Sequence, residues 1–229
     1  MRQKLLFFGD SITEFAYQPD QFTTGSALNA IYSRKLDIIH RGYAGYNSRW
    51  GLKILPKILE QDGEGVVLST LFFGANDSCI AGPQRVPIDE FKENTLAMLK
   101  LFQEKNIKVV VVGPALLDRP RWESNRPEET KMGYLRTEEE FQKYGQVLKA
   151  CAHLTNSAFV DLNKAFIEKG GDDWRELLTD GLHFSGKGYE IFFDELMQVI
   201  KDKFPQYSPE NLPSDYPYWK DVKADMSNL

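Results

Sequence analysis

The sequence predicts an α/β domain built around an open, doubly wound parallel sheet. Short apolar runs rich in β-branched and aromatic residues recur along the 229-residue chain, and longer segments with the period of a helix lie between them. Apolar runs of this kind are typical of parallel strands that helices cover on both faces. A hydrophobic content of 42% in a chain of this length is enough for one sizeable core.

Five segments are predicted strands. The first is the run KLLFFG at 4–9, and a shorter run follows at 37–41. The strongest apolar run is at 66–73, and the runs at 108–113 and 158–162 complete the set. Because open parallel sheets bind their ligands outside the carboxyl ends of the strands, functional residues are expected in the segments that follow these runs.

Predicted helices alternate with the strands. They lie at 26–35, 49–61, 89–105 and 138–155, and a last helix is predicted at 187–203. In the clearest of them, Phe91, Met98 and Phe102 fall on one stripe. The last helix repeats large apolar residues on one face, so we expect it to pack on the sheet.

Two segments interrupt this alternation. Residues 116–136 form a long, charged connection broken by prolines, and such a segment is a lid, a binding loop or an insertion. From residue 204 onward, four prolines prevent a continuous helix while five aromatic residues supply apolar area. We therefore divide the chain into a domain at 1–203 and a C-terminal arm at 204–229. Three alternatives are open for the arm: it covers its own domain, it reaches a second copy in a homodimer, or it is a frayed tail.

The overall composition excludes several classes of function. A net charge of −5 offers no basic face for phosphates, so no nucleic-acid partner is expected. No run approaches the roughly 18 apolar residues of a membrane span, and the short apolar run near the start is unlike a signal peptide. Two widely separated cysteines fit a reducing compartment. We expect a cytoplasmic protein.

The first strand runs into the sequence FFGDSITE. This places Ser11 at the carboxyl end of the strand, where a following turn or helix offers backbone N–H groups, and such a position suits a nucleophile. The other interpretation is helix capping, with Asp10 or Ser11 as N-cap and Glu14 as its partner in a capping box.

Near the other end of the chain stands TDGLHFSGKGYE, with Asp180 and His183 three positions apart in a glycine-rich turn. A carboxylate beside an imidazole fixes its tautomer and stabilises the imidazolium that forms when a serine loses its proton. The alternative is that Asp180 is a turn residue and His183 a surface histidine.

Two further segments follow the third and second predicted strands. LFFGAND puts Asn76 after the strongest apolar run, where its amide can donate to a developing oxyanion, although Asn and Asp are also ordinary turn residues. In HRGYAGYNSRW, Gly45 lets the backbone approach a ligand without a Cβ between them. All four segments are expected at one edge of the sheet, after the first three strands and the last one.

FFGDSITE, Gly45 within RGYAGYNS, GAND and DGLH together resemble the four sequence blocks of the SGNH or GDSL hydrolase superfamily, from Phe7 to His183. The resemblance implies a flavodoxin-like three-layer sandwich with a central five-stranded parallel sheet. It also implies a nucleophile at Ser11, with Asp180 and His183 as acid and base. The implied oxyanion hole consists of the backbone N–H of Ser11 with Gly45 and Asn76.

Longer strings resemble the fungal isoamyl acetate-hydrolysing esterases more closely, among them SRWGLKILP, GANDSCIAGPQ and LLTDGLHFSGKGY. This resemblance implies a serine esterase acting on small-molecule acetate esters of small apolar alcohols. A thioesterase or lysophospholipase on the same site is the alternative among enzymes, because this superfamily hosts several acyl specificities. A non-catalytic α/β module that binds a small ligand is the alternative from another class.

Other catalytic chemistries lack their sequence signals. There is no G-x-S-x-G elbow, and the three histidines show no metal-binding spacing, so we expect no metal and no cofactor. Residues 181–187 nearly spell a Walker A loop, but Gly188 stands where a hydroxyl would hold magnesium. Cys151 falls on an apolar helical stripe, which predicts a core cysteine rather than a thiol nucleophile.

Overall fold

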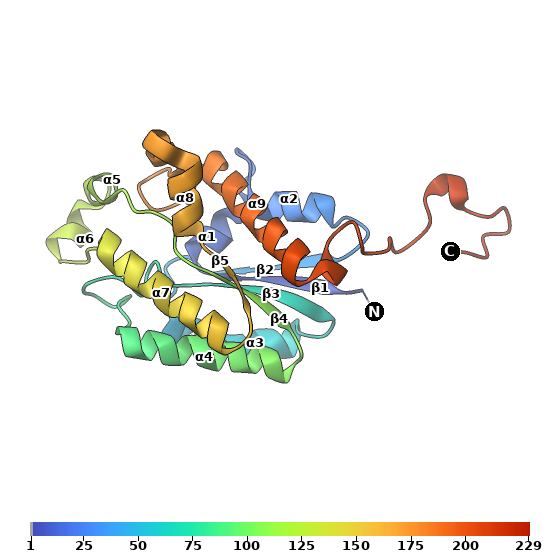
Figure 1. Cartoon of the computed structure of the whole chain (residues 1–229), viewed down its shortest axis with the longest axis horizontal. Helices are drawn as coiled ribbons and strands as arrows, with labels where there is room; N and C mark the ends of the chain where they lie inside the picture. The colour runs from blue at the N-terminus through green and yellow to red at the C-terminus, as the bar shows by residue number, and fades with distance from the viewer. Residues whose placement is uncertain (1) are drawn as a thin grey trace.

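A computed structural model describes residues 2–229, and its centre is one five-stranded sheet in the order β2-β1-β3-β4-β5. All neighbouring strands run parallel (Figure 1). The strands are β1 (Lys4–Gly9), β2 (Asp37–Gly42), β3 (Val66–Phe72), β4 (Lys108–Val112) and β5 (Ala158–Val160). The predicted doubly wound α/β fold is confirmed.

The strand order reverses between β1 and β3, because the chain first adds β2 on one side of β1 and then adds the other strands on the opposite side. Gly9 at the end of β1 is in register with Gly42 of β2 and Phe72 of β3. The three strands therefore end at the same level. The segments that follow them lie at the switch point where α/β sheets form their ligand sites.

Alternate residues of β1 enter two separate cores. Leu5 and Phe7 belong to the core on one face of the sheet and Leu6 and Phe8 to the core on the other, and none of the four is exposed. This follows from the two-residue period of a strand. Burial on both faces explains why the run is continuously apolar instead of alternating.

Three helices cover each face. On the face of Leu5 and Phe7 lie α2 (Thr24–Ile31), α8 (Leu162–Gly170) and α9 (Gly186–Lys203). On the other face lie α3 (Ser48–Gln61), α4 (Ile88–Glu104) and α7 (Glu138–Leu154), as Figure 1 shows. The result is a three-layer sandwich.

The predicted helices α3, α4, α7 and α9 begin and end within one residue of the expected positions. The prediction at 26–35 was wrong at both ends, since α2 spans Thr24–Ile31. The prediction of a strand to residue 162 was also wrong. The strand β5 ends at Val160, and the side chain of Asp161 accepts a hydrogen bond from the N–H of Lys164 at 3.1 Å, which caps α8.

Short helical segments fill several connections. The long connection at 116–136 contains two of them, α5 (Arg119–Ser124) and α6 (Pro127–Lys131). A single turn, α1 (Ser11–Glu14), follows β1 directly. The 3₁₀ segments are η1 (Phe15–Tyr17), η2 (Gly171–Leu177), η3 (Pro205–Tyr207) and η4 (Trp219–Asp221).

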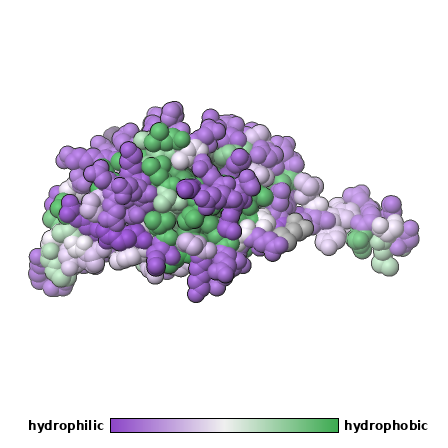
Figure 2. Space-filling model, turned by 90° about the horizontal axis from the view of Figure 1, so that it is seen from below, coloured by the Kyte–Doolittle hydropathy of each residue, from purple (hydrophilic) through white to green (hydrophobic). Residues whose placement is uncertain are grey.

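The C-terminal arm has two parts. In the first part, Phe204 is 9% exposed and belongs to a core cluster, and Tyr207 and Leu212 pack against that cluster. The carbonyl of Arg34 accepts from the N–H of Asp215 at 2.7 Å, which links the predicted arm to the segment after α2. The last residues extend away from the body, where Figure 2 shows a mainly hydrophilic projection with a few hydrophobic residues near its end.

Within residues 2–229, no helix combines the length and the apolar character needed to cross a membrane.

Candidate active site

Ser11 is the first residue of α1, directly after β1. The carboxylate of Asp10 accepts a hydrogen bond from the N–H of Ile12 at 3.0 Å and so caps this turn. The capping interpretation is therefore correct for Asp10. Glu14 does not complete a capping box, because its carboxylate accepts from the N–H of Ala44 at 2.5 Å. With the cap supplied by its neighbour, the Ser11 hydroxyl is available to other partners.

The hydroxyl of Ser11 lies next to the imidazole of His183, although the two residues are 172 positions apart. Ser11 Oγ is 2.9 Å from Nε2 of His183, and Nδ1 of the same ring is 2.8 Å from Oδ2 of Asp180. Ser11 is 6% exposed and the His183 side chain is 15% exposed. The structure thus brings the three predicted residues into one hydrogen-bonded chain, most of it shielded from solvent.

The turn that carries Asp180 and His183 is held by hydrogen bonds from its backbone to the side chain of Asp180. Oδ1 of Asp180 accepts from the N–H groups of Leu182 at 3.1 Å and of His183 at 2.9 Å. Residues Leu178 and Phe184 close the turn as an antiparallel bridge. The sequence predicted that this turn follows the last strand directly. Instead, α8 and η2 lie between β5 and residue 180.

Asp180 is charged in this environment. Burial alone would raise the pKa of its carboxyl, but the hydrogen bond and positive charge of His183, together with the two backbone donors, lower that pKa well below the ordinary value. A second cation also reaches it, since Nη2 of Arg126 is 3.0 Å from Oδ2. An ionised Asp180 accepts from Nδ1 of His183 and leaves Nε2 free to accept a proton.

Two aromatic rings enclose the imidazole of His183. The ring of Phe15 lies edge-on at 5.0 Å between centroids, and the ring of Trp122 at 5.7 Å. The guanidinium of Arg126 in turn stacks on the ring of Trp122, with its central carbon 3.4 Å from the ring centroid. These contacts restrict the imidazole to the plane that joins Ser11 and Asp180.

Asn76 follows β3 and lines the same cavity as Ser11 and His183. It is 4% exposed, and its amide Nδ2 donates to the carbonyl of Tyr46 at 2.8 Å. A side-chain amide has two N–H donors, so one remains for a ligand. Gly45 lies next to Tyr46, with a backbone φ of +79°, in the left-handed region that favours glycine. Its carbonyl accepts from Nε2 of Gln84 at 2.9 Å.

These residues open into a cavity of about 490 Å³. Ser11, Asn76 and His183 line it together with side chains that have large apolar faces and with three charged side chains. The apolar faces belong to Phe15, Tyr46, Trp50, Trp122, Tyr134 and Leu182, and the charged side chains to Arg126, Glu129 and Arg136. A small apolar molecule with one polar group fits such a site, because the apolar faces bind the apolar part while Ser11, Asn76 and His183 orient the polar group.

The connection at 116–136 forms one wall of this cavity through Trp122, Arg126, Tyr134 and Arg136. Of the three roles that the sequence left open, its place in the cavity lining favours a binding loop. The wall is attached to the loop that follows β3, because the N–H of Ile80 donates to the carbonyl of Leu135 at 2.8 Å.

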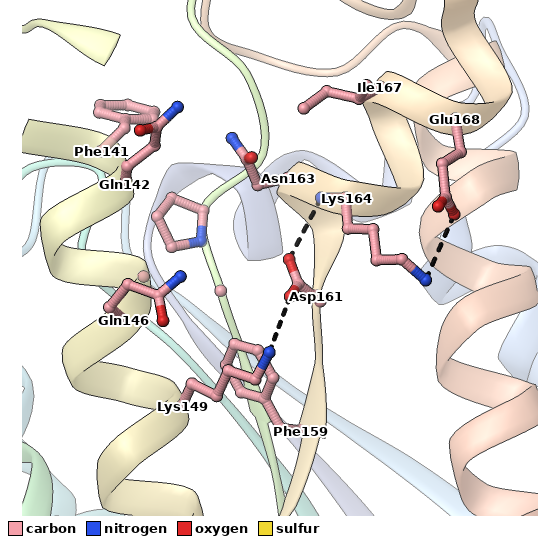
Figure 3. Close-up of a pocket in the computed structure, with 13 residues that line it drawn as sticks. Phe141, Gln142, Gln146, Lys149, Phe159, Asp161, Asn163, Lys164, Ile167 and Glu168 are labelled. Carbon is pink, nitrogen blue, oxygen red and sulfur yellow. Dashed lines mark hydrogen bonds and ion pairs between the residues drawn. The ribbon is translucent and has the colours of Figure 1, made fainter. Parts of the chain in front are cut away.

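A second, smaller hollow of about 230 Å³ lies between α7 and α8 (Figure 3). Its charged side chains pair with one another, Lys149 with Asp161 at 3.5 Å and Lys164 with Glu168 at 3.5 Å. None of the predicted site residues lines it. The cavity lined by Ser11, Asn76 and His183 is therefore the candidate active site.

Sequence reasoning missed three polar contributors to this site: Gln84, Arg126 and Arg136. Both arginines belong to the irregular connection, whose composition carries no period that could place a side chain. Gln84 follows Asn76 by eight positions in GANDSCIAGPQ, and the only available signal was that this string resembles a known family. Among residues 2–229, no group of three or more His, Cys, Asp or Glu side chains is arranged to hold a metal ion.

Comparison with known proteins agrees with this geometry. A model of the GDSL-like Lipase/Acylhydrolase family matches residues 7–191. The isoamyl acetate-hydrolyzing esterase of Saccharomyces cerevisiae is 49% identical, over 99% of this chain and 98% of the yeast protein. The isoamyl acetate-hydrolyzing esterase 1 homolog of Homo sapiens is 32% identical, over 99% and 92% of the two chains.

Among solved structures, the lipase/acylhydrolase from Enterococcus faecalis superimposes with a TM-score of 0.69 at 26% identity, covering 93% of this chain and 98% of that one. The match in fold thus extends over nearly the whole of both molecules, and the sequence match covers the segments from Ser11 to His183. The chain belongs to the GDSL-like Lipase/Acylhydrolase family and is a carboxylic ester hydrolase.

Proposed function

We propose that this chain hydrolyses short-chain carboxylic esters, in particular acetates of small apolar alcohols such as isoamyl acetate, with Ser11 as nucleophile. The observation that carries the proposal is the continuous hydrogen-bonded chain from Ser11 Oγ through His183 to Asp180, which opens onto the aromatic cavity. The yeast relative at 49% identity is named for the hydrolysis of isoamyl acetate, which supports the choice of substrate.

Acylation begins when Nε2 of neutral His183 accepts the hydroxyl proton of Ser11. The serine oxygen then attacks the ester carbonyl carbon, and the electron pair of the carbonyl bond moves to its oxygen. When this tetrahedral intermediate collapses, the bond to the alcohol oxygen breaks and that oxygen takes the proton from His183. The acyl group stays on Ser11, and the alcohol leaves through the open side of the cavity.

Deacylation repeats these steps with water. His183 accepts a proton from water, the oxygen of that water attacks the acyl carbon, and Ser11 leaves with the proton that His183 returns. The carboxylic acid is released and the enzyme is restored. In both halves the charge of Asp180 stabilises the imidazolium and keeps Nδ1 protonated.

The oxyanion hole of this proposal consists of the backbone N–H groups of Ser11 and Gly45 with the side-chain amide of Asn76. Ser11 supplies its N–H as the first residue of α1, where the first turn of a helix leaves N–H groups unpaired. The amide of Asn76 is 4% exposed, so its free donor acts in a region with little water. Donors fixed in this way lower the barrier without reorganising during the reaction.

Hydrolysis of p-nitrophenyl acetate, butyrate and decanoate tests the acyl preference. The proposal expects kcat/KM to be highest for acetate and to fall with chain length, because a cavity of about 490 Å³ must also hold the alcohol. A preference for decanoate would instead favour a thioesterase or lysophospholipase. Absence of turnover with every ester, in a folded protein, would favour a binding module.

We further propose that the C-terminal arm reaches a second copy of the chain and forms a homodimer. Tyr216, Tyr218 and Trp219 are 60%, 54% and 69% exposed, and aromatic residues of this kind are enriched at protein interfaces. Light scattering should give twice the mass of one chain for the full protein and one chain after deletion of residues 218–229. Equal masses for the two would contradict the proposal.

A cytoplasmic location is also proposed. Cys79 and Cys151 are both free and buried, which suits a compartment in which disulfides rarely form. Fractionation of cells that express the tagged protein would test it, and recovery from the secreted fraction would contradict it.

A further inference from the structure

Arg136 is a buried cation that forms no ion pair with a carboxylate of the described residues, although the charges of Glu129 and Asp10 act on it from further away. It is 1% exposed, and all three of its acceptors are neutral oxygens: the carbonyl of Ala75 at 2.9 Å, Oδ1 of Asn76 at 3.0 Å and Oε1 of Gln84 at 2.8 Å. Its Nη1 is buried with no partner among the described residues. Burial of a guanidinium without an ion pair is costly for stability, and the stacking of Arg136 on the ring of Trp122, at 5.0 Å to the centroid, offsets only part of that cost.

The hydrogen bonds of Arg136 determine how the amide of Asn76 is oriented. A guanidinium can only donate, so the atom of Asn76 that faces it must be the oxygen Oδ1. Gln84 donates to the same oxygen through Nε2 at 3.2 Å. The nitrogen Nδ2 is thereby directed away from Arg136 and toward the carbonyl of Tyr46, and both Asn76 and Tyr46 line the cavity.

We propose that Arg136 is a positioning residue of the oxyanion hole, which holds the amide of Asn76 in its donating orientation and polarises it. This inference rests on the proposed function, since it requires Asn76 to donate to the oxyanion. Arg136 itself does not touch the reacting atoms.

Polarisation follows from the charge of the donor. A cationic donor at Oδ1 draws electron density from the amide nitrogen, which makes the N–H groups of Nδ2 stronger donors. The effect is large here because Arg136 and Asn76 are both buried, where the field of a charge is weakly screened. Its benefit appears only when negative charge develops on the substrate oxygen. Loss of Arg136 should therefore lower kcat much more than it raises KM.

Gln84 connects two residues of the proposed oxyanion hole, Gly45 and Asn76. Its Nε2 donates both to the carbonyl of Gly45 at 2.9 Å and to Oδ1 of Asn76, while its Oε1 accepts from Arg136. The same residue thus links the loop after β2 with the loop after β3. The guanidinium of Arg136 is consequently connected to both loops, directly through Asn76 and Gln84 and onward through the hydrogen bond from Gln84 to Gly45.

The test is a double-mutant cycle of Arg136→Met and Asn76→Ala, with kcat and KM for p-nitrophenyl acetate measured separately. Asn76→Ala alone should lower kcat by roughly 10²- to 10³-fold. Arg136→Met alone should lower kcat by at least about 10-fold and change KM by less than about 3-fold. In the Asn76→Ala background, Arg136→Met should lower kcat by less than about 3-fold, because residues that act as one unit are not additive.

Arg119→Met is the matched control. Arg119 belongs to the same connection and pairs with Glu123 at 2.6 Å, but it does not line the cavity. This variant should change kcat by less than about 2-fold in either background, since a surface ion pair contributes little.

The outcomes separate the two hypotheses. If Asn76→Ala leaves kcat within about 3-fold, the proposed oxyanion hole is wrong. If Asn76→Ala is impaired but Arg136→Met has its full effect in both backgrounds, or acts on KM alone, the inference about Arg136 is wrong. Should Arg136→Met fail to fold by circular dichroism, Arg136→Gln replaces it in the cycle, because it removes the positive charge and keeps a polar side chain. Wild-type kcat in folded Arg136→Gln would then overturn the inference.

Discussion

At the scale of single residues, Asp180 binds four donors with one carboxylate: two backbone N–H groups, the ring of His183 and the guanidinium of Arg126. Asp180→Asn should lower kcat by roughly 10²- to 10⁴-fold, because an amide that donates to Nδ1 would select the wrong tautomer of the imidazole. The variant should remain folded, since Asn keeps the oxygen that accepts from the turn. Ester hydrolysis and circular dichroism measure the two effects.

The same variant also tests whether the three residues form one unit. The double variant Asp180→Asn with Ser11→Ala should have nearly the same kcat as Ser11→Ala alone, as expected of residues that act together. If the double variant shows the full product of the two single losses in kcat, Asp180 has a separate role and the three residues do not act as one unit.

Asp10 carries a cost in stability that depends on pH. Burial raises the pKa of its carboxyl to about 7, whereas in the unfolded chain it has the ordinary value of 3.8. Between these values the folded state binds more protons than the unfolded state, so the contribution of Asp10 to stability falls as pH rises from about 4 to about 7.

Asp10→Asn should remove this pH dependence while it keeps the oxygen that caps α1. The free energy of unfolding of the variant, relative to the wild type, should therefore rise by at least about 1 kcal/mol between pH 4 and pH 7 and stay constant above that range. Urea unfolding at several pH values measures it. A difference that is the same at pH 4 and pH 7 would show that Asp10 has no raised pKa.

Ser11 and Asn76 could be predicted from their positions at strand ends, whereas Arg136 in the irregular connection could not be predicted. Ser11 and Asn76 each follow an apolar run that marks a strand, and parallel strands bring their carboxyl ends to one edge. Arg136 had no such marker, because it ends a charged connection without a period. Its position depends on contacts with residues about sixty positions away, which a local pattern cannot contain.

At the scale of secondary-structure elements, the error at the end of β5 falls where two elements share one apolar run. The residues Ala158–Leu162 were predicted as one strand because they read AFVDL, yet Asp161 caps a helix and Leu162 enters the core from α8. The capping hydrogen bond decides the boundary, and Asp before an apolar residue was the available signal. Helices α5 and α6 are short, so their stability comes from tertiary contacts more than from local pattern.

The turn that presents Asp180 and His183 depends on Gly181. Its φ is +99°, and a Cβ there would lie 2.5 Å from the carbonyl oxygen of Asp118 and 2.7 Å from the backbone nitrogen of Trp122. Gly181→Ala should therefore displace this turn or the wall of the cavity. We expect a loss of at least about 2 kcal/mol in the free energy of unfolding, together with a large loss of kcat.

Gly133→Ala provides the control for backbone strain. Gly133 also has a positive φ, of +77°, but a Cβ there would meet nothing within 4 Å. This variant should lose only about 1 kcal/mol and keep its kcat. Equal losses of stability and activity in the two variants would mean that strain, and not the close approach of the wall, explains the need for Gly181.

At the scale of the whole molecule, the two parts of the C-terminal arm should differ in their contribution to stability. Phe204 is 9% exposed in a core cluster, so Phe204→Ala should lower the free energy of unfolding by about 3 kcal/mol. Trp219 is 69% exposed, and Trp219→Ala should change it by less than about 0.5 kcal/mol. Urea unfolding is to be measured at concentrations where light scattering gives the mass of one chain. Equal losses would contradict the division of the arm.

The central claim is that one serine in this chain carries the acyl group. The most direct measurement is labelling with a fluorophosphonate, followed by mass spectrometry of the peptides, for the wild type, Ser11→Ala and the control Ser33→Ala at an exposed serine of the same domain. We predict one label per chain on the peptide that contains Ser11, the same label in Ser33→Ala, and neither labelling nor ester turnover in folded Ser11→Ala. Labelling of another serine, or near-wild-type turnover in Ser11→Ala, would contradict the account.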